Sequence, residues 1–388
     1  MTLAAIPARN TSRPELQRAS RGRSRPGANP LPSSSWPFSS PGLSLLSESS
    51  TRTIRTVELQ LADAPSRSIA DYTPTPRDMA MLMALDSYRY LDRGQLQMLF
   101  FSGSRSCQYR LRWLVDHGLV RTWRVVMRPG RVCRSSIYLL SRRGAAALAD
   151  WLDEEPQPYL RRAEHALERR FHLVHQLEAN QFFVNLAFAA RDLPGHGLYH
   201  LVGEHGVQVA YAEGDERGPI PDGWGRLVTP DREILVHLEW DRGTEQPRRL
   251  RAKLHAYTAY FADRAGASAN QVLFVAPTEQ RERQISYLLP DHSDVERESC
   301  RFWTTTTAFI AATGPLGAVW AIDVSKRRVS LLDMAGLPRS DRPAEDAVAK
   351  PAWCSDVQAE VGAHEFAGVR LRPPTGAAGR AAKRTRSG

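Results

Sequence analysis

Hydrophobic residues at helical spacing mark the first part of the chain that is expected to fold. Four segments show this spacing, three in succession and one after a hairpin: 79–91, 93–101, 104–117 and 142–152. Two strand-like runs flank the turn sequence Arg-Pro-Gly-Arg, at 119–127 and 132–140. Three helices followed by a two-stranded hairpin are typical of a winged helix-turn-helix, which we expect over residues 77–152.

The next part of the chain alternates between helical and strand-like patterns. A long helix is expected at 161–191, and two further helices at 247–262 and 278–288. The strand-like runs are 198–211, 222–241 (a hairpin), 271–276, 301–305 and 318–324. Strands that alternate with helices predict an α/β fold with a mixed sheet. We expect this domain over residues 163–335, after a polar linker at 153–162.

Both ends of the chain lack a periodic apolar pattern. Residues 1–76 contain 14 serines and 10 prolines. A stretch of this composition buries too little apolar surface to offset the entropy of ordering. Residues 336–388 form a second, basic stretch, and we expect both ends to be disordered. The arginine-rich start fits a DNA-contacting arm, but a solvated tail or a misplaced start codon is favoured.

The chain is strongly basic, and arginine supplies almost all of the positive charge. The net charge is +10, and of 52 basic residues only Lys253, Lys326, Lys350 and Lys383 are lysine. Such an excess favours an anionic partner, usually nucleic acid. No apolar run approaches the roughly 20 residues of a membrane-spanning helix. The start does not resemble a signal peptide, and four scattered cysteines predict neither disulfides nor a zinc site. We therefore expect a cytoplasmic protein without a membrane partner.

The helix at 104–117, with Ser104 as its cap and Gly118 as its stop, has a polar face suited to reading DNA. With Leu111 at the centre of the buried face, four side chains point outward: Arg105, Gln108, Tyr109 and Arg112. Arginine can bind guanine, and glutamine adenine, through two parallel hydrogen bonds. In a winged helix this helix enters the major groove, so we predict that it contacts the bases of double-stranded DNA.

The hairpin adds arginines that would follow the DNA backbone: Arg121, Arg124, Arg128, Arg131 and Arg134. Residues 101–143 contain ten arginines and one acidic residue, Asp116, which is a net charge of +9. Like charges at this density repel one another and gain nothing without a counter-anion. A solvated arginine-rich face, or a winged helix used for protein contacts, stays open as the alternative.

Acidic residues cluster on the hairpin predicted in the second domain. Residues two apart on a strand share a face, so Glu239 and Asp241 project to the same side. A turn at residues 230–231 would place Asp222 directly opposite Glu239. Two carboxylates this close repel unless a proton or a divalent cation lies between them, and Mg²⁺ prefers such oxygen ligands. On spacing alone, a group of ordinary surface acids is favoured over a metal site.

Three further side chains are candidates for the same chemistry. Lys253 lies at the edge of the apolar face of helix 247–262, where its ammonium group could lean toward the acidic residues, although chance placement explains it equally well. His172 and His175 lie one turn apart and fit metal or phosphate ligands, but we favour an ordinary surface pair. No Ser-His-Asp arrangement, P-loop or GxGxxG sequence supports acyl transfer or nucleotide hydrolysis.

Several short runs together carry a resemblance to a known family: Gln95-Leu96, Arg110-Leu111, Gly118-Leu119-Val120, Pro221-Asp222-Gly223, Leu238 to Glu245, and Lys253 with Tyr257. With these runs the chain resembles the replication-relaxation family over about residues 77–290. That family occurs on bacterial plasmids and integrated mobile elements. The resemblance implies a winged helix joined to a restriction-endonuclease-like domain of the PD-(D/E)xK class.

The nuclease motif of that class matches this chain in part. Asp222 matches the first acid and Glu239 the second, and the resemblance implies that these two would hold Mg²⁺. Asp241 stands where the motif has its lysine, so Lys253 on the next helix would take that role. These four residues form the candidate catalytic set.

The resemblance also implies a function. The implied protein binds DNA and acts in the replication, relaxation or transfer of a mobile element. Its further partners would be other replication or transfer proteins. One alternative is a Mg²⁺-dependent DNA endonuclease that uses Asp222, Glu239 and Lys253. The other is a winged-helix transcription regulator whose α/β domain has no catalytic role.

Overall fold

A computed structural model describes ten segments of the chain: 58–62, 74–127, 131–168, 173–204, 208, 218–262, 269–289, 300–322, 327–338 and 369–370. All of them belong to one unit, Ser35–Gly388. Among these residues there are nine α-helices, and none of the helices is long and apolar enough to cross a membrane.

Three helices open the main described part: α2 (Pro76–Tyr88), α3 (Arg93–Phe100) and α4 (Ser104–Asp116). A capping box starts α2, in which Thr75 and Asp78 each accept a hydrogen bond from the other's backbone N–H. A second capping box, between Asp92 and Gln95, starts α3. The expected cap of α4 is wrong by one residue, because Gly103 occupies the cap position without a side-chain bond.

A hairpin follows, formed by β3 (Val120–Met127) and β4 (Arg131–Leu140), and α5 (Arg142–Leu152) comes next. The hairpin belongs to a four-stranded sheet in the order β1-β3-β4-β2, where β2 is Leu91–Asp92. Strand β1 (Glu58–Ala62) corrects the expectation of disorder across 1–76, because it pairs antiparallel with β3. Its partner strand lies some sixty residues later in the sequence, so no local sequence pattern predicts β1. The remainder of 1–73 lies outside the described residues.

The expected linker at 153–162 is also corrected. Asp153 ends α5 in a left-handed conformation, and α6 (Pro156–Glu168) begins three residues later. Arg162 on α6 forms an ion pair of 2.7 Å with Asp86 on α2. Only a narrow stripe of α6 is buried, which explains why its composition resembles that of a linker. The helix expected at 161–191 is helical in its described parts, the end of α6 and α7 (Leu173–Arg191), and 169–172 between them lie outside the described residues.

A mixed sheet forms the centre of the remaining part, in the order β13-β5-β6-β7-β8-β9, with β12 paired to β7. Its strands are β5 (Gly197–Gly203), β6 (Gly223–Val228), β7 (Arg232–Trp240), β8 (Asn270–Ala276), β9 (Arg301–Thr306), β12 (Leu337–Pro338) and β13 (Val369–Arg370). Strands β5, β6 and β7 are antiparallel neighbours, whereas β7, β8 and β9 run parallel. The expected mixed α/β architecture is therefore confirmed. The last two strands lie within the stretch 336–388 that was expected to be disordered.

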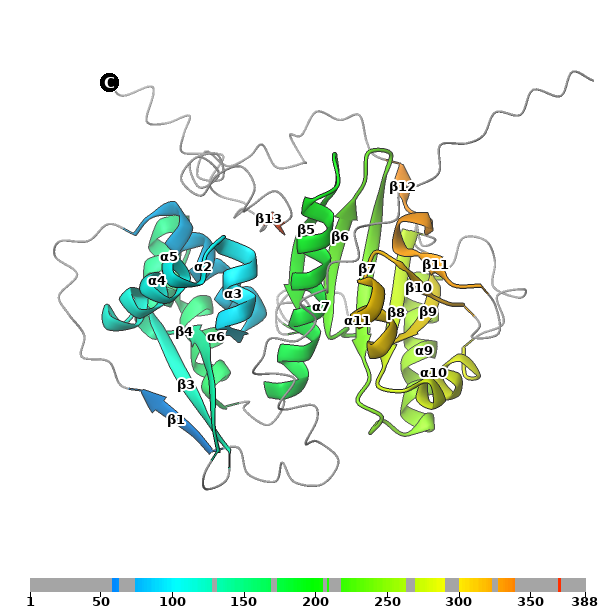
Figure 1. Cartoon of the computed structure of the whole chain (residues 1–388), viewed down its shortest axis with the longest axis horizontal. Helices are drawn as coiled ribbons and strands as arrows, with labels where there is room; N and C mark the ends of the chain where they lie inside the picture. The colour runs from blue at the N-terminus through cyan, green and yellow to red at the C-terminus, as the bar shows by residue number, and fades with distance from the viewer. Residues whose placement is uncertain are drawn as a thin grey trace, which may run out of the picture. The chain divides into compact units, whose positions relative to one another are not determined.

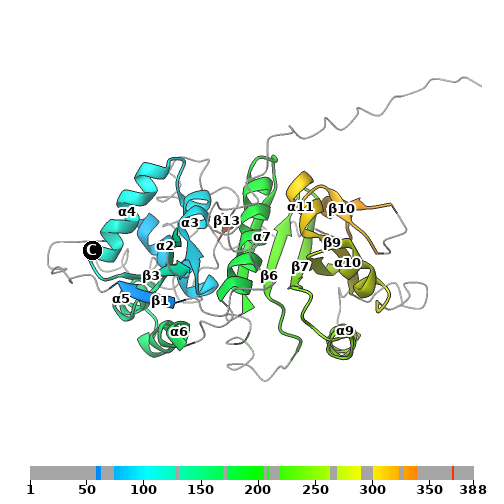
Figure 2. The same cartoon turned by 60° about the horizontal axis from the view of Figure 1, so that its bottom comes forward.

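Helices cover both faces of this sheet. On one face, α7 and α11 (Thr307–Thr313) bury Val236 and Leu238 of β7. On the other face, α9 (Pro247–Phe261) and α10 (Glu279–Ser286) bury Val272 and Phe274 of β8. The ribbon in Figure 1 shows these layers, and Figure 2 shows α7 and α9 on opposite sides of β6 and β7. A short pair of strands, β10 (Ala318–Trp320) and β11 (Val329–Ser330), and the 3₁₀ turn Leu331–Asp333 complete the described part.

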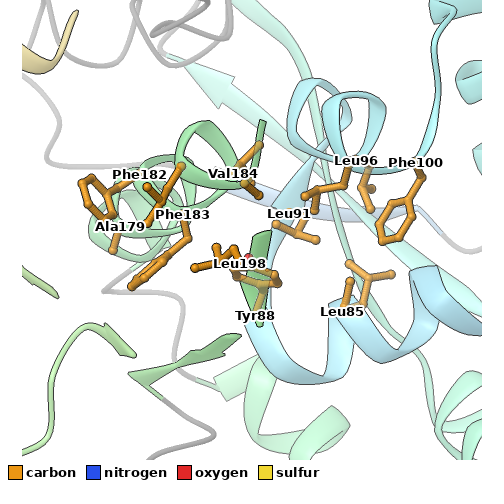
Figure 3. Close-up of a cluster of buried hydrophobic side chains, with 14 of the residues drawn as sticks. Leu85, Tyr88, Leu91, Leu96, Phe100, Ala179, Phe182, Phe183, Val184 and Leu198 are labelled. Carbon is orange, nitrogen blue, oxygen red and sulfur yellow. The ribbon is translucent and has the colours of Figure 1, made fainter. Parts of the chain in front are cut away.

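The N-terminal helices and α7 share one buried cluster. Figure 3 shows Leu96 and Phe100 of α3 on one side of this cluster and Phe183 of α7 on the other. Two hydrogen bonds join α7 to α3 and to the segment before it, from Gln95 Nε2 to the Leu177 carbonyl (2.8 Å) and from Asn180 Nδ2 to the Tyr90 carbonyl (2.7 Å). Helix α7 therefore packs against both the sheet and the helices that precede it.

Candidate functional site

A polar cleft of about 320 Å³ lies at one end of the mixed sheet. Strands β6 and β7 are antiparallel, so the start of β6 and the end of β7 meet at this edge. The register pairs Gly223 with Leu238, which is the register predicted from a turn at residues 230–231. The described pairing ends at Gly223, and just before it the Asp222 backbone N–H donates to the Leu238 carbonyl at 2.9 Å. Asp222 and Glu239 both line the cleft.

Glu239 is the most deeply buried acid of the cleft, with 2% of its side chain exposed. Its Oε2 lies 2.8 Å from Lys253 Nζ, and its Oε1 accepts a hydrogen bond of 2.7 Å from the Tyr257 hydroxyl. Both partners come from α9, where they lie one turn apart. The sequence pattern indicated Lys253 as a partner of this acid but gave Tyr257 no such role.

Burial dominates the electrostatics of this pair. It raises the pKa of Glu239 to about 7; the attraction of Lys253 opposes this shift, and the nearby Asp222 adds to it. Burial also disfavours the charge of Lys253, but Glu239, Asp222 and Glu245 together outweigh burial there and raise the pKa of the lysine. The lysine therefore stays cationic at neutral pH, whereas burial shifts the acid toward its protonated form.

Asp222 is held by a second set of contacts. Its Oδ2 accepts a hydrogen bond of 2.7 Å from the Trp240 N–H. His175 Nε2, from α7, lies 3.3 Å from the same oxygen and 2.7 Å from the Trp240 carbonyl. Burial disfavours a charged His175, but Asp222, the Trp240 carbonyl and Glu178 together outweigh it and raise the pKa of the histidine to about 9. The preference for a surface histidine pair is therefore wrong for His175; His172 lies outside the described residues.

Asp241 lines the cleft, but its carboxylate is engaged elsewhere. It forms an ion pair with Arg281 of α10 and accepts a hydrogen bond of 3.0 Å from the Gly243 N–H. Arg281 also donates to the Glu245 carbonyl at 2.7 Å, so it ties the loop after β7 to α10. The structure thus brings Asp222, Glu239 and Lys253 together and pairs Asp241 with Arg281.

Two further acids near the cleft were not singled out from the sequence. Glu245, in the loop after β7, lies 3.6 Å from Lys253 Nζ and lines the cleft. Glu178, on α7, accepts a hydrogen bond of 3.1 Å from Trp240 Nε1, and burial raises its pKa. The available signal for Glu245 was its place in the Glu-Trp-Asp-Arg-Gly-Thr-Glu run; nothing local in the sequence marks Glu178.

A second candidate surface lies on α4. Three side chains face the core, namely Cys107, Leu111 and Leu114. The four predicted outward residues, Arg105, Gln108, Tyr109 and Arg112, are all exposed, and Tyr109 has 72% of its surface accessible. Arg110 instead turns inward and forms an ion pair with the fully buried Asp78 on α2.

The hairpin arginines are described only in part. Arg121 is half-buried on β3. Arg128 lies outside the described residues, and so do the side chains of Arg124, Arg131 and Arg134.

A family model of replication-relaxation proteins matches residues 82–274, about half of the chain. This chain belongs to the replication-relaxation family. The matched range of this replication-relaxation protein begins in α2 and ends in β8, so it contains α4, the hairpin and the cleft residues His175, Asp222, Glu239 and Lys253. No curated protein and no solved structure matches the chain.

The carboxylates in the cleft of this replication-relaxation protein differ in how free they are to bind a divalent cation. Asp222 Oδ1 has no partner among the described residues, whereas both oxygens of Glu239 are bonded to Lys253 and Tyr257. Within the described ranges, no group of three or more histidine, cysteine or acidic side chains is arranged to hold a metal. Of these two acids, Asp222 therefore offers one carboxylate oxygen to a cation, and Glu239 would have to give up a bond to Lys253 or Tyr257 to bind one.

Proposed function

We propose that this replication-relaxation protein binds double-stranded DNA of a plasmid or integrated mobile element and acts in its replication, relaxation or transfer. Its family supports the theme of replication and relaxation. The observation that carries the DNA-binding part is the two-sided character of α4: one face is buried in the core, and the other exposes side chains that can bind base edges.

In this proposal, residues 77–152 act as a winged helix, with α4 in the major groove and the β3–β4 hairpin along the backbone. The element order supports the proposal, because α2, α3 and α4 precede the hairpin. The inward ion pair of Arg110 with Asp78 holds α4 on α2, so the orientation of the outward side chains is set before DNA arrives. Arginine and glutamine on that face supply bidentate contacts to guanine and adenine.

The test is a binding assay on the full chain with fluorescent duplexes from the element that encodes it. Replacing Arg105 and Arg112 with alanine should reduce discrimination between target and random sequence, by about 1–3 kcal/mol for each bidentate base interaction removed. Arg161→Ala on α6, which removes an exposed arginine elsewhere, is the control and should leave discrimination unchanged. Equal affinity of the wild type for DNA and for a neutral polymer would refute DNA binding.

A second candidate function is Mg²⁺-dependent cleavage of DNA, and the convergence of Asp222, Glu239 and Lys253 in one cleft favours it. The elements around the cleft occur in the order α7-β5-β6-β7-α9-β8, which supports a nuclease-like domain. Asp222 and Glu239 would hold the ion, which when bound supplies positive charge at the scissile phosphate. Lys253 would orient the attacking water or stabilise negative charge on that phosphate.

Supercoiled plasmid incubated with the protein, with and without Mg²⁺, tests this activity. Nicked or linear product that requires Mg²⁺ and disappears in Asp222→Asn and Lys253→Met would support cleavage. Cleavage that survives both substitutions would assign it to another site or to a contaminant. Intact plasmid together with sequence-specific binding would leave a DNA-binding protein whose α/β domain has no catalytic role, as in a transcription regulator.

A further inference from the structure

We propose that three exposed arginines at the start of α9 bind the phosphodiester backbone of nucleic acid beside the cleft. These residues, Arg248, Arg249 and Arg251, are called the α9 arginine edge below. This inference rests on the proposed function, because it adds a second binding surface for the same class of ligand.

No described residue neutralises the α9 arginine edge. All three side chains are exposed, and within the described ranges no carboxylate forms an ion pair with them. Other arginines of the same domain are matched: Arg281 pairs with Asp241, and Arg328 pairs with the buried Glu282. Three cationic groups within four residues repel one another, and an anionic ligand relieves this repulsion.

The position of the edge connects it to the cleft. Arg249 and Lys253 lie one turn apart and both line the cleft, while Arg248 and Arg251 lie beside them on the exposed side of the helix. Leu250 and Leu254 of α9 are buried in the core, so the helix is anchored to the sheet and the position of the arginine edge is fixed. The first turn of α9 contains no acidic residue, so no carboxylate there occupies the positive end of the helix dipole, which attracts anions.

The charge of the cleft explains why such an edge is needed. Its floor contains Asp222 and Glu239, and Glu245 lies in its lining. His175 and Lys253 already pair with these acids, so cationic charge for a phosphodiester has to come from the rim of the cleft. Cations spaced one helical turn apart can hold neighbouring phosphates of one strand at the rim, so that the strand reaches the cleft with its backbone neutralised.

The edge lacks the features of a protein-binding surface. Protein interfaces depend on buried aromatic or large aliphatic anchors. The exposed positions of α9 near the edge carry alanine and His255 instead, and none of the exposed large hydrophobic side chains of the described part lies on α9. An acidic protein partner is therefore the weaker explanation and becomes one outcome of the test.

The experiment compares two double variants of the full chain. Arg248→Ala with Arg251→Ala removes two charges from the edge, and Arg161→Ala with Arg283→Ala removes two exposed charges from α6 and α10. Binding to a random-sequence duplex is measured over a range of salt concentrations. In the edge variant, the slope of log K against log salt should become shallower by about 0.9 for each phosphate that is no longer neutralised, and in the control it should not change.

A third double variant, Arg248→Lys with Arg251→Lys, keeps the charge and should keep the wild-type slope. Thermal melting of each variant confirms that it is folded, since alanine favours a helix. An edge variant with the wild-type slope would overturn the inference and leave the proposed function intact. Loss of binding to polyglutamate with unchanged DNA binding would overturn it in favour of an acidic protein. A wild type that binds no DNA would instead refute the proposed function, and the edge with it.

Discussion

Replacing Glu239 with glutamine should stabilise the protein above neutral pH and have little effect near pH 5. Glu239 is 2% exposed, and burial raises its pKa from 4.5 to about 7. An acid with a raised pKa in the folded state costs stability as it ionises. This cost starts to grow above the unfolded pKa and reaches its full size above the folded pKa. Each pH unit in this interval corresponds to about 1.4 kcal/mol, so the full cost approaches about 3 kcal/mol.

The measurement is urea unfolding of the wild type and of Glu239→Gln at pH 5, 6, 7 and 8. The free energy of unfolding of the variant should exceed that of the wild type by an amount that grows with pH, toward about 3 kcal/mol at pH 8. The raised pKa of His175 is shared by both proteins and cancels in the difference. Glu279→Gln, an exposed acid on α10, is the control and should show no such trend.

The opposite result would refute the reasoning. If the variant loses stability at pH 8, the ion pair with Lys253 outweighs the burial of the acid, and this pair holds the fold together. If the variant gains stability, the protein keeps an unfavourable acid in the cleft. The second outcome is the one expected of a residue retained for function.

Two further predictions concern the same end of the sheet. The pKa of His175 is raised to about 9, so the stabilisation from its ion pair with Asp222 is fully present below pH 6.5 and disappears as the pH rises through 9. In urea unfolding, the difference in unfolding free energy between the wild type and His175→Gln should therefore shrink by up to about 3 kcal/mol over that interval. A β-carbon at Gly223 would lie 2.3 Å from the Phe183 ring, so Gly223→Ala should cost about 1–3 kcal/mol in thermal unfolding. At Gly103 the nearest atom is 3.6 Å away, so an equal loss of stability in Gly103→Ala would contradict this explanation.

The acidic hairpin shows how far a local pattern reaches in this protein. Alternation along the strand and a turn at residues 230–231 were enough to predict the pairing of β6 with β7, and the structure has that register. A two-residue period and a short connection leave few alternatives for neighbouring strands. The outward face of α4 was predictable for the same reason, because a helix repeats every few residues.

The partners of those side chains depended on packing between segments far apart in the sequence. His175 reaches Asp222 only because α7 packs across the sheet, and Arg281 pairs with Asp241 only because α10 returns to the end of β7. Strand β1 finds its hydrogen bonds on β3 for a similar reason. Periodicity records which face of an element is buried, and the sequence by itself therefore determined the elements and their faces. The tertiary structure decided which charges meet, because that depends on how the elements pack.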